Sequence, residues 1–133
     1  MFNFFNTKKD LPLGKIGEKA AVVYLKRLGY IILCTNFTNT TGKRLGEIDI
    51  IAKDGLDLVF VEVKTRKTSK NNILIIPEEN INSSKLYKLK KITNYYLKIN
   101  NLWDYPYRFD AISLLYNENE KIFNVKHLKN IFL

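Results

Sequence analysis

Three ionisable residues in the middle of the chain have types and spacing that could do chemistry: Asp49, Glu62 and Lys64. Residues two apart on a β-strand share a face, so Glu62 and Lys64 would project together while Val61 and Val63 project to the other side. If the preceding strand pairs so that Asp49 lies alongside Glu62, two carboxylates and a lysine meet at one edge of a sheet. Such a set of groups is suited to binding a hard divalent cation and to hydrolysing a phosphodiester.

The two carboxylates predict the kind of metal site. Carboxylates held close together repel each other, which raises at least one pKa unless a cation neutralises them. Mg²⁺ or Mn²⁺ would satisfy Asp49 and Glu62, could polarise a phosphodiester and could lower the pKa of a bound water, while Lys64 positions that water or stabilises the developing negative charge. The alternative is an ordinary Glu–Lys pair on an exposed strand, which contributes little to stability.

Cysteine and histidine usage excludes other kinds of site. The chain of 133 residues has one cysteine, Cys34, and one histidine, His127, so it can form neither an internal disulfide nor a Cys-rich or His-cluster zinc site. Any metal must therefore be held by oxygen. We expect Cys34 and His127 to be packing residues, because neither has a visible partner.

The elements that must position these residues follow from hydrophobic periodicity and turn signals. We predict helices over 14–28 and from 82 or 83 to about 100, and strands over 30–37, 45–53, 57–66, 107–116 and 121–126. The first three strands read as an antiparallel meander, and the long helix after them favours a parallel crossover to the fourth. The fold class is therefore α/β, a mixed β-sheet flanked by helices in the order α-βββ-α-ββ, in a single domain over 1–133, with 1–12 a candidate flexible arm.

Both predicted helices have an apolar and a basic face. The apolar positions are Ala20, Ala21, Tyr24, Leu25 and Leu28 in the first helix, and Leu86, Leu89, Ile92, Tyr96 and Ile99 in the second. Glu18 falls at the edge of the first apolar face, so its carboxylate should look toward the protein. The alternative for Glu18 is a helix-start glutamate that the helix dipole favours, and the alternative for the lysines of the second helix is a solvated face.

The charge balance indicates a polyanionic partner. The chain has 22 Lys+Arg and 13 Asp+Glu, a formal net charge of +9, which is typical of nucleic-acid contact. The alternative explanations for this charge are solubility, contact with an anionic membrane surface, and the codon bias of an AT-rich coding sequence.

No apolar run approaches the roughly 20 residues that span a bilayer, and no targeting signal is visible at the start. A cytoplasmic location and no membrane are therefore expected.

Further side chains are expected to contact nucleic acid or to pack within the protein. Basic residues on either side of the carboxylates should form a rim that binds backbone phosphates: Lys43, Arg44, Arg66, Lys67 and Lys85. Arg108 and Asp110 share a strand face and should pair. Trp103, Tyr105 and Tyr107 are expected in the core, with stacking on an exposed base as the alternative.

At these residues the sequence resembles the PD-(D/E)XK nuclease superfamily, and more closely the YraN-like family of small bacterial proteins related to archaeal Holliday-junction resolvases. The resemblance covers nearly the whole chain, up to about Asn130. Its segments are Gly17-Glu18 with Ala20, 28–30, Asn36, 46–52, 59–66, Lys85 and 108–110. Ile48 stands where the superfamily's name has proline, a residue that the resolvase branch often lacks.

The resemblance implies a restriction-endonuclease-like fold and a role for each candidate. Asp49 would be the central metal-bridging carboxylate, Glu62 the second ligand, Lys64 the catalytic lysine, and Glu18 the helix-borne carboxylate that completes the catalytic and metal-binding set. The implied function is Mg²⁺- or Mn²⁺-dependent endonucleolytic cleavage of structured or branched DNA by a homodimer. Two alternatives stay open: a non-cleaving nucleic-acid-binding module with the nuclease fold, and a protein-interaction domain whose charge is only compositional.

Overall fold

The computed structural model describes residues 11–68 and 83–131, and its elements follow the predicted order. They are α1 (Leu13–Arg27), β1 (Ile31–Phe37), β2 (Ile48–Asp54), β3 (Asp57–Thr68), α2 (Ser83–Ile99), β4 (Tyr107–Asn117) and β5 (Ile122–Leu128). The predicted α/β class and the order α-βββ-α-ββ are confirmed. Residues 1–10 of the candidate arm lie outside the described residues.

The strands form one five-stranded mixed sheet in the order β1-β2-β3-β4-β5. The pairs β1–β2, β2–β3 and β4–β5 are antiparallel, and β3–β4 is parallel. The predicted meander and the parallel crossover after α2 are both confirmed. The parallel pair runs from Leu58↔Tyr107 to Thr68↔Asn117, which makes it the longest ladder in the sheet.

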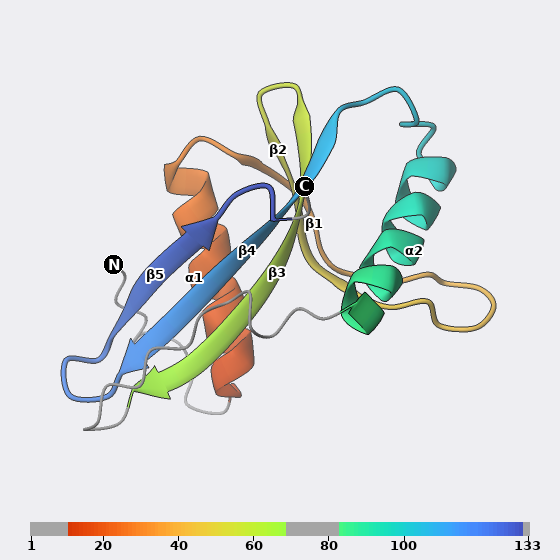
Figure 1. The fold of residues 1–133 in the computed structure, drawn as a ribbon. Coiled ribbons are helices and arrows are strands. Elements are labelled where there is room, and N and C mark those ends of the chain that lie inside the picture. Colours follow the sequence, from red (N-terminus) through yellow and green to blue (C-terminus); the bar gives the residue numbers. More distant parts are fainter. Residues whose placement is uncertain (1–10, 69–82, 132–133) are drawn as a thin grey trace.

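The two helices cover opposite faces of this sheet (Figure 1). Successive side chains of a strand point to opposite faces, so Val59 and Val61 of β3 pack under α1 while Leu58 and Phe60 pack under α2. All four are at most 2% exposed. By the same alternation Glu62 and Lys64 belong to the face that α2 covers.

The last apolar position of each predicted helix does not reach the core: α1 ends at Arg27, one residue before Leu28, and α2 ends at Ile99 itself. Leu28 and Ile99 were expected in the core, but they are 51% and 52% exposed. Both helices turn back at a residue with positive φ, Gly29 (93°) and Asn101 (54°). The N–H of Tyr30 then donates to the carbonyl of Leu25, and that of Leu102 to Leu97, a backbone pattern typical of helix C-termini. Tyr30 and Leu102 thereby pack in the core in place of Leu28 and Ile99.

A glycine in α1 allows the helix to approach β3. A Cβ atom placed on Gly17 would overlap the Thr65 Oγ1 atom and would lie 3.0 Å from the Thr65 Cβ. Gly17→Ala should therefore destabilise the fold by about 1–3 kcal/mol, although alanine is the better helix former.

Urea unfolding of Gly17→Ala beside Gly14→Ala checks this prediction. A Cβ at Gly14 of the same helix meets no atom within 4 Å, so that change should be neutral or slightly stabilising. Equal effects of the two substitutions would show that the close approach to β3 is not what requires glycine.

Candidate functional site

The sheet divides where β2 separates from β3. The β2–β3 ladder ends at Ile50↔Val61, whereas the β1–β2 ladder continues to Phe37↔Ile48 and the β3–β4 ladder to Thr68↔Asn117. We call this point, at Asp49 and Glu62, the fork (Figure 1). Asp49 directly precedes Ile50 and Glu62 directly follows Val61, the last residues that pair. The expectation that Asp49 lies alongside Glu62 is confirmed by their hydrogen bond and electrostatic interaction.

At the fork, the Asp49 side chain accepts a hydrogen bond that a backbone carbonyl of a paired strand would otherwise accept. Its Oδ2 accepts a hydrogen bond of 2.8 Å from the backbone N–H of Val63, which β2 no longer pairs. Burial and the negative charge of Glu62 raise the pKa of Asp49 to about 8, against the opposing effect of the Val63 hydrogen bond. At neutral pH the Asp49–Glu62 pair therefore retains a proton, which a bound cation would displace.

Two lysines lie beside the carboxylates. Lys85 of α2 places its Nζ 3.6 Å from Glu62 Oε1, with the Glu62 side chain only 13% exposed. A hydrogen bond with Lys85 is the main cause that lowers the pKa of Lys64, and burial and the positive charge of Lys85 act in the same direction. Lys64 is thus close to both Lys85 and Glu62, as its predicted role requires.

A hollow of about 200 Å³ opens over the carboxylates. It is lined by Gly46, Glu47, Asp49, Glu62, Lys85, Lys88 and Leu89. Sequence reasoning did not assign Lys88 to the site, although its spacing of three from Lys85 places both on one side of a helix. Gly46 has φ 154°, and a Cβ there would lie 3.4 Å from the carbonyl oxygen of Lys88. The segment that enters β2 therefore runs close against α2 and closes one wall.

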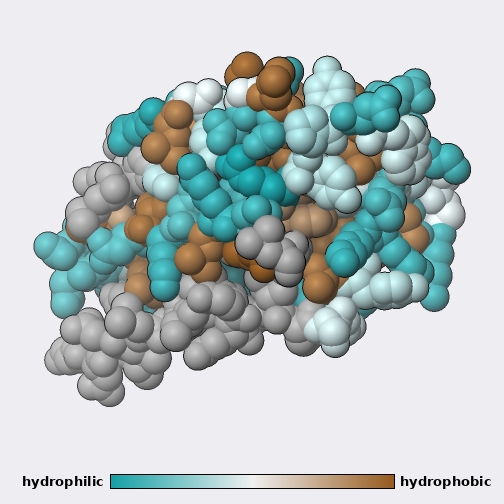
Figure 2. Space-filling model, turned by 45° about the horizontal axis from the view of Figure 1, so that its top comes forward, coloured by the Kyte–Doolittle hydropathy of each residue, from teal (hydrophilic) through white to brown (hydrophobic). Residues whose placement is uncertain are grey.

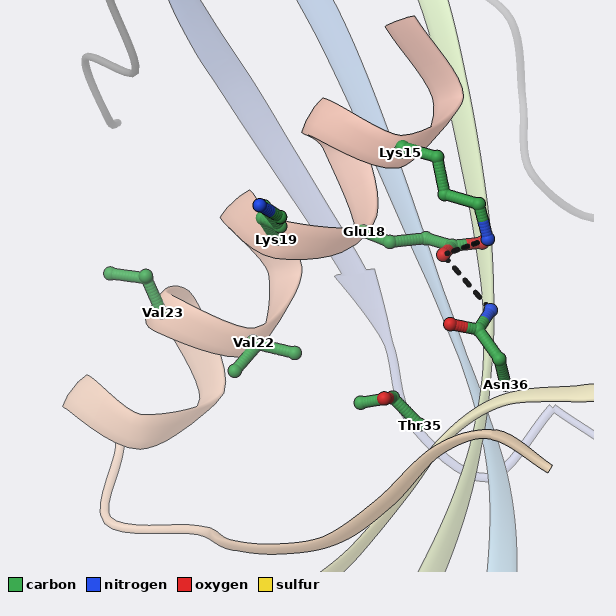
Figure 3. A pocket seen from close by; sticks show the side chains of 7 residues that line it. All are labelled: Lys15, Glu18, Lys19, Val22, Val23, Thr35 and Asn36. Carbon is green, nitrogen blue, oxygen red and sulfur yellow. Dashed lines mark hydrogen bonds and ion pairs between the residues drawn. The ribbon is translucent and has the colours of Figure 1, made fainter. Parts of the chain in front are cut away.

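Glu18 is not among the residues that line this hollow. Figure 3 shows its side chain reaching from α1 to Asn36 of β1, whose Nδ2 donates a hydrogen bond of 3.0 Å to Glu18 Oε1. The Nζ of Lys15 lies 3.4 Å from the same oxygen. A second hollow, of about 390 Å³, opens here between α1 and β1. Glu18 looks toward the protein, as expected, and its charge adds to the causes that raise the pKa of Asp49.

The residues at the fork fit a hard divalent cation. Within 11–68 and 83–131, no three His, Cys, Asp or Glu side chains are grouped closely enough to hold a metal ion. Mg²⁺, however, commonly uses one or two protein carboxylates and completes its shell with water and substrate phosphates. Asp49 and Glu62 supply such a pair of oxygen donors, and Glu18 does not belong to it.

The predicted basic rim is partly outside and partly inside the site. Lys43 and Lys67 are exposed, and Arg44 is exposed beside Glu47, with 3.7 Å between Arg44 Nη2 and Glu47 Oε2. Arg66 is half-buried and donates a hydrogen bond to the carbonyl of Thr65. Lys85 lines the hollow itself. Of the predicted rim, Lys85 thus lies within the hollow, whereas Lys43, Arg44 and Lys67 are on the surface.

A second polar cluster has a structural role. Asp110 is fully buried and accepts hydrogen bonds from Arg108 Nε (3.0 Å) and the backbone N–H of Asn130 (3.0 Å), so the predicted Arg108–Asp110 pair is confirmed. Arg108 also bonds Asp54 and Asp57 at the β2–β3 turn. The cluster therefore connects that turn with β4 and with Asn130, two residues after β5.

His127 has partners that the sequence did not reveal. Its Nε2 lies 2.8 Å from Asp110 Oδ2, and its Nδ1 lies 3.1 Å from the Tyr24 hydroxyl. The expectation of a packing residue without a partner is wrong for His127, because the β4–β5 register brings it beside Asp110. Burial acts to raise the pKa of Asp110, but the hydrogen bonds from His127, Arg108 and Asn130 hold it below its ordinary value.

The aromatic residues after α2 are not in the core. Trp103, Tyr105 and Tyr107 are 57%, 41% and 45% exposed, so the expectation that they pack inside is wrong. The turn after α2 uses Leu102 for packing and directs the next residues outward.

Among the described residues, no helix is long and apolar enough to cross a membrane.

The family model described as "Uncharacterised protein family UPF0102" matches residues 17–114. A UPF0102 protein of Caldicellulosiruptor saccharolyticus is 39% identical over 120 residues, covering 90% of this chain and 96% of the relative. One of Thermodesulfovibrio yellowstonii is 43% identical over 122 residues, covering 92% and 96%. One of Clostridium acetobutylicum is 39% identical over 119 residues, covering 90% and 92%.

Proposed function

The chain belongs to the UPF0102 family, and from its site at the fork we propose that it is a metal-dependent endonuclease that hydrolyses structured or branched DNA. The proposal includes membership of the PD-(D/E)XK superfamily and a restriction-endonuclease-like fold. One observation carries it: Asp49 and Glu62 lie side by side where the sheet divides, with lysines beside them. Buried carboxylates crowded in this way are unfavourable without a cation.

Each residue of the site has a distinct role in this proposal. Asp49 and Glu62 would hold Mg²⁺ or Mn²⁺, which when bound supplies Lewis-acid polarisation of the phosphodiester and a more acidic water. Lys64 orients the attacking water and stabilises negative charge on the phosphate, since its lowered pKa eases the loss or sharing of a proton. Lys85 and Lys88 bind the substrate phosphates at the mouth of the hollow.

One contact favours the second candidate, a nucleic-acid-binding module that does not cut. The Lys85 ammonium lies 3.6 Å from Glu62 and so already compensates part of its charge. In a binding module this ion pair would persist, and divalent cations would have no effect. In the nuclease, Lys85 would turn from Glu62 to a substrate phosphate once Asp49 and Glu62 hold the cation.

A cleavage screen tests the proposed function. Linear, flapped and four-way-junction DNA, end-labelled, would be incubated with the protein in Mg²⁺, in Mn²⁺ and in EDTA. We expect cleavage of at least one branched substrate with a divalent cation and none in EDTA. Binding to the junction without cleavage in any cation would favour the binding module instead.

The exposed basic residues should govern affinity for the phosphate backbone. Lys43→Gln and Lys67→Gln should each weaken DNA binding severalfold, independently of sequence, and each should reduce the salt slope by about one. Lys126→Gln on β5, also exposed, is the charge-matched control. Fluorescence anisotropy at several salt concentrations measures this. An affinity that does not fall between low and moderate salt would contradict the basic rim.

A homodimer remains part of the proposal, because symmetric cutting of two strands needs two sites. Sedimentation velocity with and without four-way-junction DNA measures the oligomeric state. We expect two copies on the junction, and a single protomer at high concentration under both conditions would exclude the dimer.

A further inference from the structure

The exposed aromatic side chains of the described residues are all in one stretch of the chain. Tyr87 is 60% exposed and Trp103 57%, and Tyr105 and Tyr107 are exposed by 41% and 45%. The stretch 87–107 comprises most of α2 and its connection to β4. We call Trp103, Tyr105 and Tyr107 the aromatic cluster. Exposed groups of large apolar side chains often mark interaction sites.

The backbone around the aromatic cluster is well defined. The N–H of Leu102 donates to the carbonyl of Leu97 (2.9 Å), that of Tyr105 to Leu102 (3.1 Å), and that of Leu58 to Pro106 (2.9 Å). Figure 1 accordingly shows the α2–β4 connection at the same end of the molecule as the β2–β3 turn. The backbone that carries the rings is thus ordered before any partner binds, which lowers the entropy that binding must remove.

Tyr107 of the aromatic cluster lies on the same side of the sheet as the fork. The Tyr107 ring contacts Phe60 at a centroid distance of 5.8 Å, and Phe60 belongs to the core under α2. Glu62 and Lys64 extend from that same face of β3. From Lys88, which lines the hollow, to the end of α2 is about 17 Å of helix. A polymer chain leaving the hollow along α2 would therefore reach the cluster.

The charge on the α2 side of the molecule indicates which class of polymer would bind there. Helix α2 has five lysines and no acidic residue: Lys85, Lys88, Lys90, Lys91 and Lys98. The Lys91 ammonium lies over the Tyr87 ring at 4.6 Å, and that of Lys53 over the Tyr105 ring at 5.8 Å. Figure 2, turned so that the top of Figure 1 comes forward, shows brown and near-white residues in separate groups among teal ones. A continuous hydrophobic face, typical of a protein interface core, is not seen in this view.

We propose that the aromatic cluster stacks on unpaired bases of a single-stranded segment whose phosphates follow the lysines of α2. Aromatic rings beside a row of positive charge are the arrangement by which proteins hold single strands, since stacking needs only a π-face and works for any base. The inference rests on the proposed function and narrows its substrate class to DNA with an unpaired segment next to the cleavage site.

The single tryptophan of the chain is a direct probe, because Trp103 alone reports on the cluster. The protein would be titrated in EDTA with oligothymidylate of about 12 nucleotides and, separately, with a duplex of the same length. We expect strong quenching of Trp103 emission by the single strand, reversed by salt, and weak quenching by the duplex. Emission that depends on protein concentration without DNA would instead assign the cluster to a second copy, and overturn the proposal.

Variants separate this inference from the nuclease proposal. Trp103→Ala and Tyr105→Ala should each weaken binding of labelled oligothymidylate roughly tenfold while duplex affinity stays within about twofold. Ile31→Ala on the edge strand β1, 62% exposed, is the control and should change neither. Both variants replace exposed rings, and circular dichroism would verify their fold. Unchanged single-strand affinity in both, or binding without quenching, would overturn the stacking site and leave the nuclease proposal standing.

Discussion

Asp49→Asn and Glu62→Gln should each lower the rate of DNA cleavage by about 100-fold or more, because each removes an oxygen ligand of the proposed cation. DNA binding in EDTA should be retained or slightly tighter, since each change removes a negative charge that repels phosphate. Lys64→Ala should abolish cleavage to a similar extent for a different reason. The cation should still bind, whereas DNA affinity falls modestly.

Single-turnover cleavage and anisotropy in EDTA measure these two effects separately. Glu118→Gln, an exposed acid in the turn between β4 and β5, is the charge-matched control and should leave both unchanged. An exposed Glu–Lys pair without a metal would give near-neutral effects for all three site variants. Cleavage within a few-fold of wild type in Asp49→Asn would therefore contradict the assignment.

The largest effect on stability is expected at Asp110. Asp110→Ala leaves Arg108 and His127 without the buried carboxylate that they share, so it should reduce the free energy of unfolding by about 3–5 kcal/mol. Asp57→Asn, whose side chain is 45% exposed in the same cluster, should change it by about 1 kcal/mol or less. Urea unfolding of both variants at neutral pH measures the difference.

The contribution of Asp110 should also depend on pH with a definite sign. The pKa of Asp110 in the folded protein is below its ordinary value, so its stabilising effect is complete above the unfolded-state pKa of about 3.9. The effect is lost as the pH falls through the lower folded-state pKa. The stability gap between wild type and Asp110→Ala should therefore narrow below about pH 4. A gap that stays constant down to pH 2 would show that the carboxylate charge does not contribute.

The fold could be predicted from sequence because its signals are local. The apolar residues 58–61 mark the strand before Glu62, and the short turn between β2 and β3 sets a register that ends at Ile50↔Val61, next to Asp49 and Glu62. That Glu62 and Lys64 lie close together could be predicted for the same reason, because side chains two residues apart on a strand point to the same face.

Features that depend on long-range packing could not be predicted. The bond between Glu18 and Asn36 needs the distance between α1 and the end of β1, and the His127–Asp110 contact needs the β4–β5 register. The exposure of Trp103 depends on which residue after α2 turns inward, and the helical periodicity ends before that point. The sequence pattern therefore located the candidate site residues Asp49, Glu62 and Lys64, but it did not identify the partners of Glu18 and His127.

Calorimetric titration with Mn²⁺ tests the metal site at the fork most directly. Because the pKa of Asp49 is about 8 in the metal-free protein, Mn²⁺ binding at pH 7 should release about one proton, seen as a heat that depends on the ionisation enthalpy of the buffer. Wild type and Lys64→Ala should bind Mn²⁺ with this proton release, whereas Asp49→Asn and Glu62→Gln should bind weakly or not at all. No binding to wild type, or equal binding to Asp49→Asn, would contradict a metal site formed by Asp49 and Glu62.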